Sequence, residues 1–456
     1  MGEAEAPPSP AVMSRSVFYD GCPGCAMERK LESSKGIPYK EFIFVGITTI
    51  ASSLPISSLF PFLYFMIEDL HVAKKEQDIG LYAGFLGASY MVGRCFASLF
   101  WGVVADRIGR KPIIKFSILS VVIFNTLFGL SVRYWMAIAT RFLLGALNGM
   151  LAPVKLTGSQ QLQAYSIEVC RPEHQALGLS IVSTGWGIGL VVGPAIGGYF
   201  AQPAKQYPNI FSEKSIFGRF PYFLPCLCIS LIALVVLISC IWLPETLHKH
   251  KNVEGGIEMI DNSRSTLEED SHKQKNLYKN WPLISSIIAY CVFTLHDTAY
   301  SEIFSLWAVS DKKYGGLSFS SKEVGQVLAV AGAGLLVYQL FIYRSVHRFL
   351  GSVNSSRVAS VTLSIPILAA YPFMTHLPGF RLGIALYLAT ILKGVLSHKV
   401  KEVLRMVYLQ QQCPSSRQLL QQEQALCSLG PKNAKMQPSF QVGLVLTFKP
   451  FLAIPN

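Results

Sequence analysis

Charged residues are scarce in this sequence of 456 residues. They make up 15% of the chain, whereas hydrophobic residues make up 51%. The charges fall in short clusters between long apolar runs, which is unlike a soluble domain. Because about 20 apolar residues cross a bilayer as one helix with its own backbone hydrogen bonds, these runs predict an all-α, multi-pass membrane protein.

Other features are lacking too. The sequence has no nucleophile–base arrangement, phosphate-binding loop or set of four metal ligands, so we expect neither an enzyme nor a bound cofactor. Its ten cysteines are scattered and predict no disulfide framework. No apolar segment of a cleaved signal peptide occurs near the start. The net charge of +13 comes largely from loops, where it fixes membrane orientation, and does not indicate nucleic acid as a partner.

The apolar runs predict ten spans, with the N-terminus in the cytoplasm. A charged segment, 244–280, predicts a cytoplasmic linker between an N-terminal six-helix bundle, 42–243, and a C-terminal half of four spans, 281–396. Two six-helix bundles around such a linker are typical of secondary transporters, whose partners are lipid, a small solute and protons. The expected spans are 42–67, 80–104, 113–131, 134–154, 176–201, 220–243, 281–310, 324–343, 358–376 and 380–396.

Two segments break this pattern. Polar residues 156–163 interrupt the fourth span and predict an insertion. From 397 to 456 the chain has a polar tail and only the remnant of a last helix, so the last two helices are expected to be missing. Back-translation of Met406–Gln418, read one nucleotide earlier, can give a small-residue stretch typical of a transporter helix. This predicts a frame-shifted or misspliced form.

A segment rich in glycine and charge joins the second and third spans. Its glycines allow helix ends to approach and the chain to turn tightly. Its aspartate can accept hydrogen bonds from a helix N-terminus and pair with Arg110. We expect it to latch the cytoplasmic side in one conformation, and the alternative is a merely positive loop. The segment contains Gly102, Asp106, Arg107, Gly109, Arg110 and Lys111.

The fifth span contains Gly189, Gly193, Pro194, Gly197 and Gly198. Glycine at every fourth position lets another helix pack closely, and proline removes one backbone hydrogen bond. The spacing predicts a tightly packed, pliable helix, and the alternative is an ordinary packing seam.

Ionisable residues inside apolar spans are the candidates for transport and proton coupling. His296, Asp297, Tyr300 and Glu302 lie in the seventh span, where such groups usually face a bundle interior. Helical geometry turns Asp297 and Glu302 about 140° apart. Arg141 in the fourth span needs a carboxylate or carbonyl partner if it is buried. The alternatives are a structural hydrogen-bond network for the seventh span and an Arg141 that reaches the interface.

The N-terminal tail, 1–41, carries Cys22-Pro-Gly-Cys25. Two thiolates at this spacing can share a zinc ion, but a structural site needs four ligands. The pair therefore predicts at most weak metal binding, and an inert or weakly metal-sensing tail is favoured.

Several strings resemble the zinc-induced facilitator-like family of plant major facilitator superfamily transporters. They are CPGCAMERK, RFLLGALNG, the stretch from AYSIEVCRPEH to GGYFAQPA, and LHDTAYSEIFSLWAVS with YGGLSFSS. The resemblance implies a monomeric antiporter of the vacuolar or plasma membrane, involved in zinc and iron homeostasis. It also implies export of small metal chelators such as nicotianamine. Alternatives are a truncated isoform that does not transport, and a membrane metal sensor.

Overall fold

The computed structural model describes residues 19, 21–33, 36–148, 161–171, 174–247, 281–342, 345–346 and 364–412. Within these ranges every regular element is a helix, as the composition predicts. Most of the predicted insertion and linker, and the tail beyond 412, lie outside the described residues. The last three residues of the predicted insertion, 161–163, form the first turn of a short helix, α7 (Gln161–Glu168).

The N-terminal half is a bundle built around two clusters of buried apolar side chains. The predicted first span, 42–67, is divided into α2 and α3 by a break that begins after Ser57 and contains Pro61. The main helices of the N-terminal half are α2 (Tyr39–Ser57), α3 (Leu63–Asp69), α4 (Ile79–Ile108), α5 (Arg110–Gly129), α6 (Tyr134–Leu147), α8 (Gln175–Phe200) and α11 (Phe223–Ser239). Its shorter elements are α9 (Pro203–Gln206), α10 (Ile216–Arg219) and the 3-10 turns η1 (Glu76–Asp78) and η4 (Cys240–Trp242).

The C-terminal half contains α13 (Trp281–Val309), η6 (Lys312–Tyr314), α14 (Ser321–Val337) with the π-helical turn η7 (Tyr338–Ile342), α17 (Ser364–Met374) and α18 (Gly379–Gln412). The predicted start of the polar tail at 397 falls inside α18, which continues for 34 residues. Leucine, lysine, glutamate, arginine and glutamine are strong helix formers, so a helix can persist where the apolar pattern ends. The part of α18 that is apolar enough to cross the membrane is therefore shorter than the helix itself.

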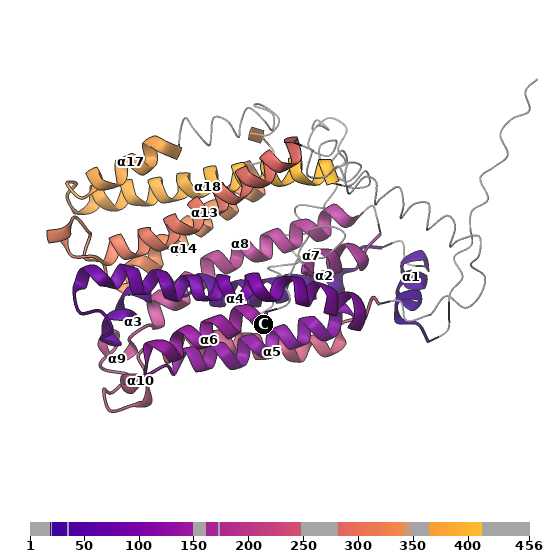
Figure 1. Ribbon diagram of the computed structural model, residues 1–456, viewed down its shortest axis with the longest axis horizontal. Coiled ribbons are helices and arrows are strands. Elements are labelled where there is room, and N and C mark those ends of the chain that lie inside the picture. The colour runs from indigo at the N-terminus through magenta and orange to yellow at the C-terminus, as the bar shows by residue number, and fades with distance from the viewer. Residues whose placement is uncertain are drawn as a thin grey trace, which may run out of the picture.

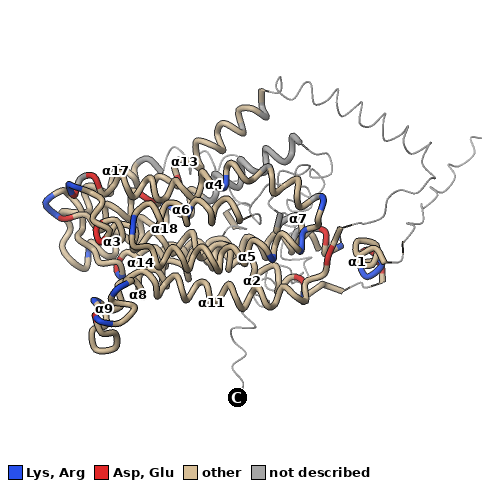
Figure 2. The backbone as a smooth tube through the Cα atoms, turned by 60° about the horizontal axis from the view of Figure 1, so that its bottom comes forward, with Lys and Arg blue, Asp and Glu red and all other residues tan. Residues whose placement is uncertain are grey.

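Five helices within the described ranges are long and apolar enough to cross a membrane: Arg110–Gly129, Leu177–Phe200, Phe223–Trp242, Ser321–Ile342 and Gly379–Ser397. Figure 2 shows Lys, Arg, Asp and Glu gathered mainly at the two ends of the bundle, with few in its middle. This separation is what a bilayer requires, because a charge is costly within the hydrocarbon.

The N-terminal tail forms a helix, α1 (Pro23–Ser33), at one end of the molecule (Figure 1). The Gly24 N–H donates to the Leu247 carbonyl at 3.1 Å. Arg171 Nε donates to the Leu31 carbonyl at 2.6 Å, so it satisfies a carbonyl at the helix C-terminus. Lys30 pairs with Glu41 of α2 at 2.5 Å. The tail is therefore docked on the N-terminal bundle, and we call this end the tail side and the opposite end the far side.

The two halves meet along α8 and α14 and at the far side. There, Ala308, Val309 and Val324 of the C-terminal half pack against Tyr64 and Phe65 of the N-terminal half. Because these side chains close the space between the first and seventh spans, the far side is shut in this conformation.

Candidate functional site

The predicted latch segment forms the junction of α4 and α5. Gly109 separates the two helices at φ +109°, and a Cβ there would come 2.8 Å from the carboxylate of Glu245. Only glycine fits both conditions without strain. The Glu245 carboxylate accepts the Arg110 N–H at 3.2 Å, so it satisfies one of the free donors at the start of α5.

Arg110 also makes a bidentate salt bridge with Glu168 of α7: its Nε donates to Oε2 at 2.7 Å and its Nη2 to Oε1 at 2.5 Å. Lys111 Nζ donates to the Ile241 carbonyl at 3.1 Å. The described contacts of the latch thus tie the second, third, fourth and sixth spans within one bundle. Arg107 is exposed and Gly102 is buried, and the side chain of Asp106 lies outside the described residues, so its predicted pairing with Arg110 stays a prediction.

The glycines of α8 are arranged on two faces. Gly189, Gly193 and Gly197 face α2, where a Cβ on any of them would overlap Ser53, Ser57 or Ser58. The hydroxyl of Ser57 donates to the Gly189 carbonyl at 2.9 Å. The predicted close helix packing is therefore present between α8 and α2.

The other face of α8 packs on α14 of the opposite half. A Cβ on Gly198 would come 2.7 Å from the Ser321 carbonyl and 2.8 Å from Gly325 Cα. Pro194 lies inside α8 and cannot donate to the carbonyl of Leu190. That carbonyl lies 2.7 Å from where a Cβ on Gly332 would sit. The glycine motif therefore lets α8 pack at backbone distance against α2 of its own bundle and against α14 of the other bundle.

Polar side chains tie the two halves at the far side. Gln206 Nε2 donates to Ser321 Oγ at 3.0 Å, and Gln326 Nε2 donates to the Tyr199 hydroxyl at 2.5 Å. Lys313 lies 3.5 Å from Glu76 of the other half and 3.1 Å from Asp311. The hydrogen bond from Lys313 lowers the pKa of the Asp311 carboxyl, so Asp311 stays ionised at neutral pH.

Arg141 of α6 is 2% exposed, so the alternative of an arginine that reaches the interface is not what the structure shows. Its Nη1 donates to the Pro55 carbonyl at 2.9 Å, and its guanidinium lies 4.4 Å from the centre of the Phe128 ring. The Pro55 carbonyl is available because α2 ends at Ser57, so no later helical N–H reaches it. Arg141 thus satisfies a backbone carbonyl in the last turn of α2.

The polar cluster of α13 meets a residue that the sequence analysis did not select. Lys393 of α18 is 2% exposed, and its Nζ lies 2.6 Å from Asp297 Oδ1. The same ammonium lies 3.6 Å from the centre of the Tyr300 ring. The hydroxyls of Tyr300 and Tyr371 are 2.6 Å apart. A buried ion pair with an aromatic wall therefore joins α13, α18 and α17.

This pair is deep in the membrane. At 1.5 Å per residue, Asp297 lies roughly 18 Å from the far-side end of α13, and Lys393 roughly 21 Å from that of α18. In a hydrocarbon core about 30 Å thick, both lie near the midplane, where transporter sites are found.

Glu302 lies away from this contact. The Glu302 carboxylate faces α4, where it fills the space that a Cβ on Gly87 would need. His296 is half-buried on α13. Asp297 and Glu302 thus face different helices, in agreement with their predicted separation around α13.

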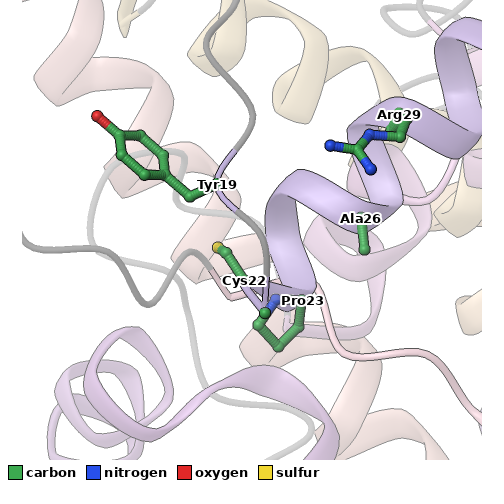
Figure 3. Close-up of a pocket in the computed structure, with 6 residues that line it drawn as sticks. Tyr19, Cys22, Pro23, Ala26 and Arg29 are labelled. Carbon is green, nitrogen blue, oxygen red and sulfur yellow. The ribbon is translucent and has the colours of Figure 1, made fainter.

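Cys22 and Cys25 are both buried at the start of α1. Figure 3 shows Cys22 beside a small pocket of about 240 Å³, lined by Tyr19, Gly21, Cys22, Pro23, Ala26 and Arg29. No group of three or more His, Cys, Asp or Glu side chains that could hold a metal ion occurs in the described part of the chain. Metal binding by the two cysteines stays a prediction.

Lys393, Glu168 and Glu245 escaped the sequence analysis. A lysine inside the predicted tenth span, 380–396, was the available signal for Lys393, because its burial requires a counter-charge. Glu168 and Glu245 follow the fourth and sixth spans on the same predicted side as Arg110, and that shared side was the signal for them.

A family model described as Major Facilitator Superfamily matches residues 45–414. The chain is 52% identical to Protein ZINC INDUCED FACILITATOR 1 of Arabidopsis thaliana, over 85% of this chain and 80% of that protein. It is 51% identical to Protein ZINC INDUCED FACILITATOR-LIKE 1 of the same plant, over 83% and 78%.

Solved structures share the fold at low identity. The crystal structure of a D-xylose–proton symporter has a TM-score of 0.56 at 12% identity, over 90% of this chain and 86% of that one. A bacterial homologue of the human lysosomal transporter Spinster, in an inward-facing and unoccupied conformation, has a TM-score of 0.55 at 14% identity, over 92% and 83%. From its sequence match, its relatives and its fold, this chain belongs to the zinc-induced facilitator-like family of the major facilitator superfamily and is a multi-pass membrane transporter.

Proposed function

We propose that this transporter is a proton-coupled antiporter that exports a small organic metal chelator, such as nicotianamine, across the vacuolar or plasma membrane. The observation that supports the proposal best is the buried pair of Asp297 and Lys393 near the membrane midplane. A buried ion pair adds little net stability, so its retention in an apolar span favours a functional role.

The pair offers both charges that an amino-acid-like chelator needs. An ammonium group of the solute binds ionised Asp297, and a carboxylate of the solute binds Lys393. The ring of Tyr300 lies against the Lys393 ammonium and forms an aromatic wall beside the charges. The solute therefore replaces an existing charge pair and leaves neither charge alone in a site of low dielectric.

Proton coupling follows from competition for Asp297. A proton on this carboxylate removes the counter-charge for the solute's ammonium, so the solute leaves. Loss of the proton restores the site. Because the carboxylate holds either a proton or the solute, the two move in opposite directions, which is the definition of antiport.

The proposal is tested in sealed vesicles that contain the full chain with its tail side outward. An acid interior is expected to drive uptake of labelled nicotianamine at least about tenfold above the rate without a gradient, since one pH unit supplies about 1.4 kcal/mol. A protonophore should abolish the difference, and Asp297→Asn should remove uptake altogether. Gradient-driven uptake that survives the protonophore would contradict the proposal.

A further inference from the structure

Glu302 occupies a position that the solute site does not use. It is half-buried on α13, about 10 Å from the far-side end of that helix at 1.5 Å per residue, and it faces the opposite half of the molecule. Its carboxylate lies where a side chain at position 87 of α4 would otherwise be. Gly87 therefore provides the space that Glu302 fills when the two halves are together.

No hydrogen bond or ion pair of Glu302 occurs within the described ranges. Several ionisable groups of the surrounding helices have other partners. Asp297 and Lys393 bind each other, Asp69 accepts from Tyr222, and Glu323 caps α14. The remaining ionisable groups on the described parts of α3, α4, α14 and α18 near this position are Tyr64, Glu68, Asp78, Tyr82, Tyr90, Arg94, Lys322, Arg381 and Tyr387.

A carboxylate without a partner is costly to keep ionised between packed helices, because burial removes its water. The cost vanishes if the group binds a proton, or if the helices separate and water enters. The position of Glu302 makes these two events alternatives: a proton is needed while α13 and α4 are together, and it is no longer needed once the far side opens and water enters.

We propose that Glu302 is a second proton-binding site, separate from Asp297, whose protonation is linked to closure of the far side. Protons then favour the conformation described here, and loss of the proton favours opening of the far side. The inference rests on the proposed transport cycle, but it concerns the gate and needs no solute.

The test is the accessibility of a cysteine placed at the closed far side. Ala308 is fully buried among residues of both halves, so an Ala308→Cys chain should react with a membrane-impermeant maleimide added to the far side only when that side opens. The chain without this cysteine gives the background. Raising the far-side pH from about 5 to about 8 should increase the labelling rate by roughly tenfold, because ionised Glu302 favours opening.

Three further variants decide the role of Glu302. Glu302→Gln should keep labelling low at every pH. Gly87→Ala should raise labelling at every pH, because the added methyl group displaces the carboxylate. Gly84→Ala is the matched control, since a Cβ at Gly84 meets nothing within 4 Å, and it should behave like the parent.

A pH response that persists unchanged in Glu302→Gln would overturn the inference. It would not affect the proposed antiport, which is measured by uptake. Conversely, proton-driven uptake could fail while the pH response of labelling still depends on Glu302. That result would contradict the antiport proposal but support the role of Glu302 in closing the far side.

Discussion

Lys393→Ala is expected to lower the rate of solute uptake at least about a hundredfold. The substitution leaves Asp297 half-buried near the midplane without its counter-charge, and removing one partner of a buried pair costs about 3–5 kcal/mol. It also removes the group proposed to bind the solute's carboxylate. The measurement is the initial uptake rate per amount of folded protein in vesicles.

Two controls separate transport from folding. The double variant Asp297→Asn, Lys393→Gln leaves no unpaired charge, so it should recover folded protein but not uptake. Lys205→Ala removes a pair with Asp69 in which the lysine is 65% exposed, and such surface pairs contribute only about 0–1 kcal/mol. Uptake by the double variant at the parent rate would show that the pair is only structural.

Gly198→Val is expected to lower uptake at least about tenfold by holding α8 and α14 apart. Its Cβ would come within 2.8 Å of Gly325 Cα, which is backbone and cannot rotate away. Overpacking of this kind costs about 1–3 kcal/mol, which here falls on the closed conformation. The measurement is uptake, together with labelling of Ala308→Cys, which should increase.

Gly383→Val in α18 is the matched control, because a Cβ there meets nothing within 4 Å. It should transport like the parent. Normal uptake by Gly198→Val would contradict a functional role for the close contact between the halves. Reduced uptake with unchanged labelling would show that the contact acts on something other than the far-side gate.

The helical membrane fold could be predicted from the sequence because hydrocarbon imposes a simple rule on span length and polarity. One of the strings that carry the family resemblance contains the glycine motif of α8, and that motif lies at close helix contacts in the structure. Element ends were less predictable. The end of α18 depends on helix propensity beyond the bilayer, and the break between α2 and α3 lies inside one apolar run.

The partners of the polar residues could not be predicted from one sequence. Asp297 and Lys393 are 96 positions apart, and only the packing of α13 on α18 brings them together. Helical geometry predicted that Glu302 faces away from Asp297, but only the packing shows that Gly87 of the other half lies against it. Spacing along a helix gives a residue's face, whereas the partner on that face depends on how the helices pack.

The structure separates three tasks. The latch around Arg110 and Glu168 ties the tail side of one bundle. The glycine faces of α8 let the bundles touch, and Asp297 with Lys393 forms the charged centre of the second half. We expect substitutions of the first two groups to alter the balance of conformations, and substitutions of the third to abolish binding.

The central claim is that solute and protons cross in opposite directions through the carboxylate of Asp297. Proton movement driven by solute in liposomes tests it most directly, with the full chain, a trapped pH dye and no initial pH gradient. Nicotianamine added to the tail side should make the lumen alkaline as it enters, and Asp297→Asn should give no change. Entry of nicotianamine without any change in lumenal pH would contradict the account.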